Sequence, residues 1–160
     1  MTVPQSGNSS DHQTSHLKSN TTTLHSCLQY LSDKATDEWR EHNCPVDVKS
    51  LGKASWTLLH TTAAYYPDRP APSQMDTMRT FINTFAENYP CWHCREDFQR
   101  SIKESPVRVG SRKKLSEWLC QRHNEVNVKL GKETFDCTKV FERWLDGPAD
   151  GRCDAPKKKA

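Results

Sequence analysis

The sequence predicts an all-α fold, a four-helix bundle with a short fifth helix and a disordered N-terminal arm. The 160 residues, 34% of them hydrophobic, suit one compact domain. From Cys44 onward the apolar residues recur at helical spacing, and runs of β-branched residues or Asn-Gly turns, which would indicate hairpins, are almost absent. Pro and Gly divide the helical pattern into segments with short connections, which is typical of an antiparallel bundle.

The first part of the chain is expected to be a flexible arm over residues 1–43. Ser, Thr, Asn, Gln and His dominate its beginning and leave few apolar side chains for a core. Residues 27–43 contain some apolar side chains without a sustained period, so they form either a tether that docks transiently or an inert tail. Residues 44–154 would then form the folded domain and residues 155–160 a short basic tail.

Two helices are expected before the middle of the chain. Asp47 is placed to cap the first helix, which should stop before Pro67. Ser73 and Asp76 resemble a capping box for the second helix, which should run to Pro90. The side chains expected to face the core are Leu51, Leu58, Leu59 and Ala63 in the first helix and Met75, Met78, Ile82, Phe85 and Tyr89 in the second.

Three further helices are expected in the rest of the domain. Pro90 suits the first turn of the third helix. Ser111 opens the fourth helix and Gly131 ends it, while Asp136 caps a short fifth helix that ends at Gly147. The apolar side chains of these helices are Phe98 and Ile102, then Leu115, Trp118, Leu119, Val126 and Leu130, and finally Val140, Phe141, Trp144 and Leu145.

Composition argues against several functional classes. The 23 Lys and Arg residues against 20 Asp and Glu residues leave a net charge of +3, which is too small and too evenly spread for a nucleic-acid surface. No apolar run approaches the roughly 20 residues that cross a bilayer, and residues 1–30 lack the apolar core of a secretory signal. Neither a Gly-x-Gly-x-x-Gly nor a phosphate-binding loop occurs. We therefore expect a protein that acts in solution without nucleic-acid or membrane partners, and whose side chains would hold any nucleotide.

Seven cysteines are the chemically informative residues. Cys91 and Cys94 form a Cys-x-x-Cys pair at the expected start of the third helix, where free backbone N–H groups and the helix dipole stabilise a thiolate. His93, between them, would add positive charge when protonated. This pattern favours thiol–disulfide exchange. Because the count is odd, one cysteine is left over if six pair, and Cys27 in the arm is the natural candidate.

Zinc binding is a second interpretation of the same region. The Cys-x-x-Cys pair followed by Cys120 and His123 has the spacing of a tetrahedral zinc site. Against zinc, the polar stripe continues to Asn124 and Asn127 over about two helical turns, which is more than a metal needs. Such an amide-rich wall favours hydrogen bonds to a heteroaromatic ring, although an ordinary exposed polar face has the same spacing.

Several motifs between residues 44 and 154 resemble the FAD-linked sulfhydryl oxidases of the Erv/ALR family. They occur in the order that the family shows, and they cover most of the predicted domain. The motifs are Cys44-Pro45-Val46-Asp47, Leu51-Gly52-Lys53-Ala54-Ser55-Trp56-Thr57-Leu58-Leu59-His60, Tyr89-Pro90-Cys91-Trp92-His93-Cys94, Trp118-Leu119-Cys120, His123-Asn124-Glu125-Val126-Asn127, Phe135-Asp136-Cys137, Arg143-Trp144 and Asp146-Gly147.

The resemblance implies a homodimer with non-covalent FAD at the mouth of the bundle and with no metal. Cys91 would be the interchange thiol that the substrate reaches, and Cys94 the thiol beside the flavin. The structural disulfides that it implies are Cys120–Cys137 within a subunit and links through Cys44 and Cys153 between the two subunits. The implied FAD contacts are Gly52, Lys53, Trp56, His60, Tyr89, His123, Asn124, Val126, Asn127, Lys129, Lys132, Arg143 and Trp144.

The activity that the resemblance implies is the formation of disulfides in protein substrates. Electrons would pass from a substrate dithiol to FAD, and then to oxygen, giving hydrogen peroxide, or to cytochrome c. Family members without a secretory signal work in the mitochondrial intermembrane space, where they oxidise the import disulfide carrier. This chain departs from the long members at Cys27, which stands alone where they carry a second Cys-x-x-Cys, and at Pro148, where relatives have Trp.

Overall fold

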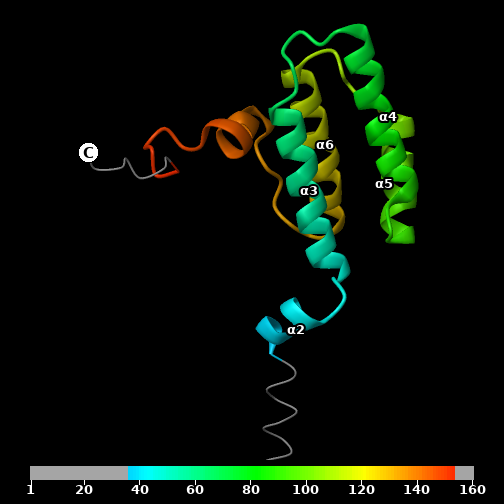
Figure 1. The fold of residues 1–160 in the computed structure, drawn as a ribbon, viewed down its shortest axis with the longest axis vertical. Coiled ribbons are helices and arrows are strands. Elements are labelled where there is room, and N and C mark those ends of the chain that lie inside the picture. Colours follow the sequence, from blue (N-terminus) through cyan, green and yellow to red (C-terminus); the bar gives the residue numbers. More distant parts are fainter. Residues whose placement is uncertain (1–35, 154–160) are drawn as a thin grey trace, which may run out of the picture. The chain divides into compact units, whose positions relative to one another are not determined.

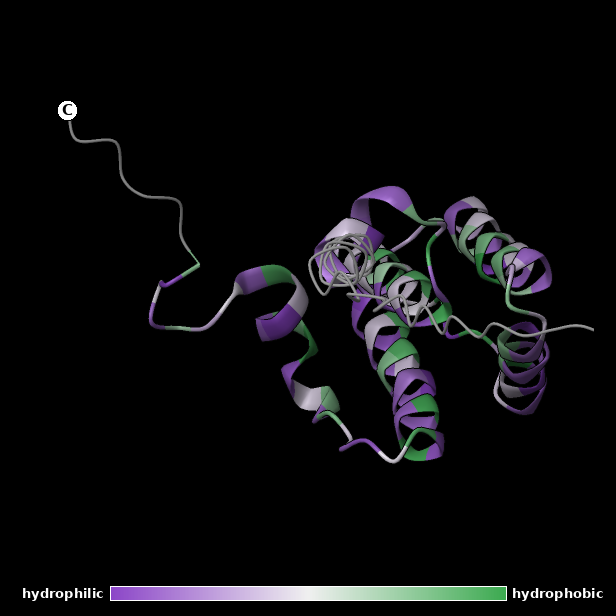
Figure 2. Ribbon diagram, turned by 90° about the horizontal axis from the view of Figure 1, so that it is seen from below, coloured by the Kyte–Doolittle hydropathy of each residue, from purple (hydrophilic) through white to green (hydrophobic). Residues whose placement is uncertain are grey.

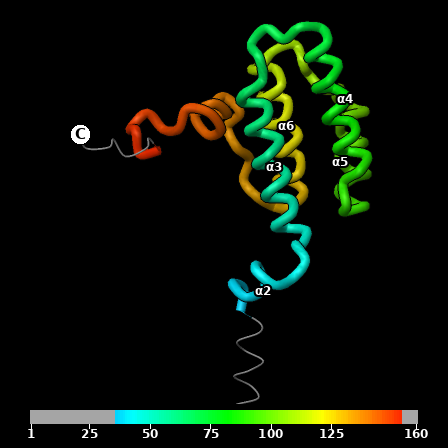
Figure 3. Tube along the Cα trace, in the orientation of Figure 1, coloured from blue at the N-terminus to red at the C-terminus, as the bar shows by residue number. Residues whose placement is uncertain are grey.

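The computed structural model describes residues 36–153, so Cys27 and the basic tail expected at residues 155–160 lie outside the described residues. Every regular element within residues 36–153 is helical, which confirms the all-α fold class (Figures 1 and 3). The elements are α2 (Asp37–Asn43), α3 (Val48–Ala64), α4 (Pro72–Asn88), α5 (Trp92–Glu104), α6 (Arg112–Lys129), η1 (Cys137–Lys139) and η2 (Glu142–Asp146).

Helix α2 belongs to a compact unit that ends at Pro45, and the helices from α3 onward belong to a second unit. The Thr36 hydroxyl caps α2 by accepting a hydrogen bond from the Trp39 backbone N–H at 3.2 Å. Asp37 and Glu38 place negative charge at the positive end of the helix dipole. The hydrophobic pattern does not predict this helix, because none of its residues is buried.

Helix α3 begins where the sequence predicts. The Asp47 carboxylate accepts a hydrogen bond from the Ser50 backbone N–H at 2.6 Å, and this bond holds the pKa of Asp47 below its usual value. The predicted capping box of α4 at Ser73 is wrong. Pro72 occupies the first turn, where its missing N–H removes no helical bond, and Gln74 Oε1 accepts from the Ala71 backbone N–H at 2.8 Å.

Helices α5 and α6 also begin near their predicted starts. Cys91 is the N-cap of α5, so Pro90 lies just before the helix and not in its first turn. The Ser111 hydroxyl caps α6 by accepting from the Lys114 backbone N–H at 3.2 Å. Gly131 follows the end of α6 with a φ of 66°, a conformation that costs glycine little because it has no Cβ.

The predicted fifth helix is divided into two short turns. Asp136 caps the 3₁₀ turn η1, and its carboxylate accepts from the Thr138 backbone N–H at 3.0 Å. The π-helical turn η2 follows, and Gly147 ends it with a φ of 75°. The predicted bounds were therefore close, but an unbroken α-helix was wrong.

The second unit is built from two helix pairs, with α3 against α6 and α4 against α5 (Figure 1). Polar and apolar residues alternate along these helices, as expected for helices with one buried face (Figure 2). Trp118 is fully buried, and its indole N–H donates to the Ser105 carbonyl at 3.0 Å. The buried core contains Leu59, Ala63, Tyr66, Ile82, Val107, Val109, Leu115, Trp118 and Leu119, with Met75, Met78, Phe85, Phe98 and Ile102 packed against it.

Two leucines expected in the core are exposed instead. Leu130 follows the last turn of α6 and is 61% exposed. Leu58 is 54% exposed, because α3 turns its other side, with Leu59 and Ala63, into the core. Leu58 and the C-cap residue Tyr65 lie two turns apart on one side of α3, and we name these two exposed apolar residues the α3 stripe. Periodicity identified an apolar face here without showing what would cover it.

None of the helices described between residues 36 and 153 is both long and apolar enough to cross a membrane.

Truncating Leu119 should destabilise the fold far more than truncating Leu130. Leu119 is fully buried, so Leu119→Ala should lower the free energy of unfolding by about 2–5 kcal/mol through lost burial and a cavity. Leu130→Ala, the control at the exposed C-cap of the same helix, should change it by about 0.5 kcal/mol or less. Urea titrations followed by circular dichroism measure both values, and equal effects would contradict the assigned core.

Candidate functional site

Cys91 and Cys94 are joined by a disulfide at the N-terminus of α5. The Cys91 sulfur accepts a hydrogen bond from the Cys94 backbone N–H at 3.4 Å, so it lies at the positive end of the helix dipole. Both cysteines are half-buried, whereas His93 and Trp92 between them are exposed, Trp92 by 64%. The disulfide is therefore partly accessible, and the two residues between its cysteines are open to a partner.

Phe98 connects the disulfide helix to the interior. It lies four residues after Cys94, so the two side chains share one face of α5. The Phe98 ring contacts the edge of Trp56 on α3 with ring centroids 6.0 Å apart, and it contacts Trp118 on α6 at 6.4 Å. The face of α5 that carries Cys94 is thereby packed toward α3 and α6.

Four planar rings from three elements meet beside this contact. We name Trp56, His60, His123 and Trp144 the aromatic cluster. Trp56 stacks on His123 with centroids 4.2 Å apart and planes inclined by 4°, and His60 stacks on Trp144 at 4.8 Å and 7°. The two stacks are joined by a 3.0 Å hydrogen bond between His60 Nε2 and His123 Nδ1. All four rings are residues that the resemblance implied as cofactor contacts, and the fold brings them together.

Burial keeps both histidines neutral. His60 is 3% exposed, and burial together with the positive potential of His123 and Arg143 lowers its pKa from 6.5 to about 3. Burial and the charge of Lys132 lower the pKa of His123 as well. One histidine therefore donates in the shared hydrogen bond and the other accepts. Among the described residues, nothing pairs with the buried His60 Nδ1, which leaves one polar atom of the cluster for a ligand.

A second disulfide, between Cys120 and Cys137, ties η1 to α6. One turn further along α6, Asn124 Nδ2 donates to the Phe135 carbonyl and Asn124 Oδ1 accepts from the Phe135 N–H, both at 2.8 Å. The following turn η2 packs against α3, which brings Trp144 over His60. The C-terminal part of the domain is thus held by α6 and completes the aromatic cluster.

The basic residues predicted to meet a cofactor are differently placed. Lys129 Nζ lies 2.6 and 2.7 Å from the two carboxylate oxygens of Asp97, so it links α6 to α5. The Arg143 guanidinium lies over the Trp144 ring, 4.5 Å from its centroid. Lys53, near the start of α3, and Lys132, just after α6, are exposed at the same end of this antiparallel helix pair, and neither has an ion pair among the described residues.

The remaining predicted contacts lie around the cluster. A Cβ added to Gly52 would meet no atom within 4 Å, so the surface one turn before Trp56 is open. Tyr89 contacts the cluster only through a chain of rings, since it lies against Phe85 with centroids 5.4 Å apart. Asn127 donates to Asn124 Oδ1 at 3.4 Å, and Val126 is half-buried on α6.

Sequence patterns did not reveal three residues that organise this region. Phe98 was expected only as a core residue, although its position one turn after Cys94 could have indicated the link. Asp97 carries no sequence signal for its tertiary pairing with Lys129. The role of the Phe135 backbone carries no sequence signal either, because its hydrogen bonds with Asn124 depend on the path of the loop.

The zinc interpretation requires four ligands that the structure does not bring together. Cys120 is bonded to Cys137, and Cys91 to Cys94. Within residues 36–153, no group of three or more His, Cys, Asp or Glu side chains is placed to hold a metal ion.

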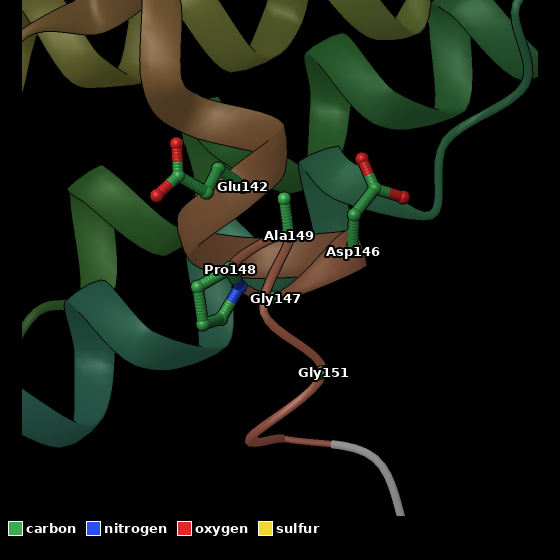
Figure 4. A pocket seen from close by; sticks show the side chains of 6 residues that line it. All are labelled: Glu142, Asp146, Gly147, Pro148, Ala149 and Gly151. Carbon is green, nitrogen blue, oxygen red and sulfur yellow. The ribbon is translucent and has the colours of Figure 1, made fainter.

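A separate open pocket lies at the end of the described chain, lined by Glu142, Asp146, Gly147, Pro148, Ala149 and Gly151 (Figure 4). It contains no member of the aromatic cluster. Of the described cysteines, Cys44 and Cys153 are exposed and unpaired.

Acid should destabilise the ligand-free protein through His60. The unfolded chain binds a proton near pH 6.5, whereas the folded chain resists it until about pH 3. The contribution of neutral His60 to the free energy of unfolding is therefore complete above pH 6.5. The free energy of unfolding then falls by at most about 1.4 kcal/mol per pH unit as the pH drops toward 3. His60→Phe removes this titration, so its stability should fall less than that of wild type. Urea titrations across this pH range test it, and parallel losses in both proteins would contradict the assignment.

Comparisons with known proteins agree on one family. The sequence profile of the Erv1 / Alr family matches residues 53–145. The mitochondrial FAD-linked sulfhydryl oxidase ERV1 of Saccharomyces cerevisiae is 48% identical over 103 residues, which cover 64% of this chain and 54% of that protein. The FAD-linked sulfhydryl oxidase ERV1 of Arabidopsis thaliana is 39% identical over 114 residues, or 71% and 56% of the two chains. The chain thus spans about half the length of these curated relatives.

Solved structures show the same fold. The crystal structure of the yeast Erv1 core matches with a TM-score of 0.64 and 47% identity, over 65% of this chain and 88% of that one. The crystal structure of the FAD binding domain of Erv1 from Saccharomyces cerevisiae matches with a TM-score of 0.63 and 46% identity, over 65% and 99%. Since the family profile covers more than half of the sequence and these structures share its fold, the chain belongs to the Erv1 / Alr family.

Proposed function

We propose that the protein is an FAD-dependent thiol oxidase that forms disulfide bonds in protein substrates. The observation that carries this proposal is the Cys91–Cys94 disulfide, whose helix packs through Phe98 against the aromatic cluster. A redox-active cysteine pair thereby lies next to a site suited to a planar cofactor. The names of the relatives, FAD-linked sulfhydryl oxidases, support the same chemistry.

The residues present fit FAD on three grounds. The aromatic cluster provides flat faces for a planar heteroaromatic ring, and its unpaired His60 Nδ1 offers one hydrogen bond to that ring. The surface above Gly52 is open to a close approach. Lys53, Lys132 and Arg143 supply positive charge for phosphates. We propose that these residues hold the cofactor together with Tyr89, Val126, Asn127 and Lys129, in which case Lys129 must share its charge between Asp97 and a phosphate.

Exchange begins at Cys91. A client thiolate attacks the Cys91 sulfur, the Cys91–Cys94 bond breaks, and the electron pair leaves on Cys94. The second client thiol then attacks the client sulfur of the mixed disulfide, which releases Cys91 as a thiolate and leaves the client oxidised. The Cys94 N–H that points at Cys91, together with the helix dipole, stabilises the leaving thiolate in this second step.

Cys94 passes the electrons on. Cys94 lies one turn before Phe98 on the same face of α5, whereas Cys91 is the N-cap, and we infer that Cys94 is the cysteine nearer the cluster. Bound FAD would accept the two electrons taken from the client and deliver them to oxygen, giving hydrogen peroxide, or to cytochrome c. The neutral histidines add no positive charge of their own to the cluster, and the nearby cation is the Arg143 guanidinium over Trp144.

The proposed subcellular location is the mitochondrion, and within it the intermembrane space. Two relatives, from Saccharomyces cerevisiae and Schizosaccharomyces pombe, are named mitochondrial. Disulfides persist where the compartment is oxidising, and this compartment would provide that condition for the two disulfides of the domain. The client there would be the import disulfide carrier.

We also propose a homodimer. The α3 stripe of Leu58 and Tyr65 is the exposed apolar row that a second copy would bury. Cys44 and Cys153 are exposed and have no disulfide partner within residues 36–153, so both could form disulfides between subunits. A second copy suits the stripe because an isologous contact places the same apolar row on both sides.

Replacing Cys94 should separate flavin binding from catalysis. Cys94→Ser leaves the aromatic cluster intact, so the purified protein should stay yellow with stoichiometric flavin and lose dithiol-dependent oxygen uptake. Cys153→Ser is the matched control and should keep both properties. Oxygen consumption and the visible flavin spectrum test this. Wild-type protein that lacks flavin, or full activity in Cys94→Ser, would contradict the proposed oxidase.

Adding a methyl group at Gly52 should affect folding and flavin binding in opposite directions. In the interior of α3, Gly52→Ala should stabilise the flavin-free protein by about 0.5–1 kcal/mol, because alanine loses less entropy in a helix. If the cofactor approaches this surface, the same methyl group should weaken flavin binding. Thermal melts without flavin and fluorescence titrations with FAD measure the two effects, and tighter flavin binding would argue against contact at Gly52.

A charge on the α3 stripe should separate the proposed dimer. Leu58→Lys places an ammonium group in the row that two copies would bury, so sedimentation under reducing conditions should show a monomer where wild type is a dimer. Leu130→Lys, at the similarly exposed leucine that caps the end of α6, is the control and should remain dimeric. A monomeric wild type, or an unaffected Leu58→Lys dimer, would rule out this interface.

A further inference from the structure

We propose that Asn124 is a positioning residue that holds the loop before η1 against α6, and thereby keeps Trp144 stacked on His60, instead of contacting the cofactor directly. This assignment rests on the proposed binding of FAD at the aromatic cluster. It replaces the direct contact that the family resemblance implies for Asn124 with an effect transmitted through the backbone.

The hydrogen-bonding capacity of the Asn124 amide is filled within the protein. Its nitrogen donates to the Phe135 carbonyl at 2.8 Å and lies 3.5 Å from the Cys137 sulfur. Its oxygen accepts from the Phe135 N–H at 2.8 Å and from Asn127 at 3.4 Å. An asparagine amide has two N–H donors and two acceptor lone pairs, so these contacts leave none for a ligand.

The paired bonds to Phe135 complement the nearby disulfide. The Cys120–Cys137 bond fixes the loop to α6 at one point, about which the segment is otherwise free to turn. Asn124 lies one helical turn after Cys120 on the same face of α6. Its amide is hydrogen-bonded to the backbone of Phe135, two residues before Cys137. Two attachments along α6 set both the position and the direction of the chain that enters η1.

That direction determines where the C-terminal aromatic ring lies. From η1 the chain passes through Val140, which is 2% exposed and anchored in the core, to η2. Turn η2 packs against α3, where Trp144 stacks on His60. The Arg143 guanidinium lies over the Trp144 ring. Because His60 is nearly fully buried under this ring, loosening the loop would admit water to the cluster and weaken its hold on a planar ligand.

The experiment compares the two possible roles in full-length protein. Asn124→Ala removes both bonds to Phe135, whereas Asn124→Asp keeps only an acceptor and serves as the second variant if the alanine protein does not fold. Asn43→Ala is the matched control, because the Asn43 amide also donates to a backbone carbonyl at 2.8 Å but lies in the separate N-terminal unit. The measurements are hydrogen exchange at the Phe135 amide in protein stripped of flavin, and the dissociation constant for FAD.

A positioning role predicts a change in both measurements. In Asn124→Ala, exchange at Phe135 should accelerate by about 10-fold or more, and FAD binding should weaken by a similar factor. In Asn124→Asp the carboxylate still accepts from the Phe135 N–H but repels the Phe135 carbonyl, so both changes should be smaller and in the same direction. Asn43→Ala should change neither. Weaker FAD binding with unchanged exchange would overturn the proposal in favour of direct contact, and faster exchange with unchanged FAD binding would show that the loop does not govern the site. If wild type itself binds no FAD, the proposed function fails, and this assignment fails with it.

Discussion

The attachment of residues 135–137 to α6 is the constraint on which the candidate site depends. The Cys120–Cys137 disulfide closes a loop whose cross-link is worth roughly 3 kcal/mol in the chain-entropy model, and the Asn124 amide adds two hydrogen bonds beside it. Without these links, the short turns after the loop have too few residues to form stable helices alone. The covalent bond that stabilises the domain therefore also assembles the aromatic cluster.

The aromatic cluster is held at some cost to stability. His60 is desolvated with one nitrogen unpaired, and such a polar atom is unfavourable in a folded protein unless a ligand or water satisfies it. The flanking core compensates, because Leu59, Leu119 and Trp118 are nearly or fully buried on the same helix pair. A dense core beside an unsatisfied buried polar atom is the arrangement expected where binding, and not folding, selected the residues.

Local signals predicted the helices well. Asp47 and Ser111 cap α3 and α6 because capping depends only on residues three positions apart, and Gly131 ends α6 for an equally local reason. The start of α4 escaped prediction because Pro72 and Gln74 supplied a competing cap. Leu58 was misplaced because periodicity marks an apolar face without identifying its neighbour.

The site was less predictable than the helices that carry it. Motif resemblance named the four rings that gather around His60, but it could not show that Lys129 pairs with Asp97 or that Asn124 binds the Phe135 backbone. Both contacts join segments distant in sequence, and their partners have no characteristic spacing. Residues whose roles depend on the path of a loop need coordinates, whereas caps and core faces follow from neighbours along the chain.

Gly147 has a further consequence for the end of the chain. A Cβ at this residue would lie 3.1 Å from the Cys153 Cβ, and its φ of 75° already disfavours other residue types. The chain after η2 therefore folds back, and the Cys153 side chain packs against the backbone of Gly147. The position of the Cys153 thiol therefore depends on this close approach to Gly147. A single methyl group at residue 147 would shift the thiol and change how a second molecule meets it.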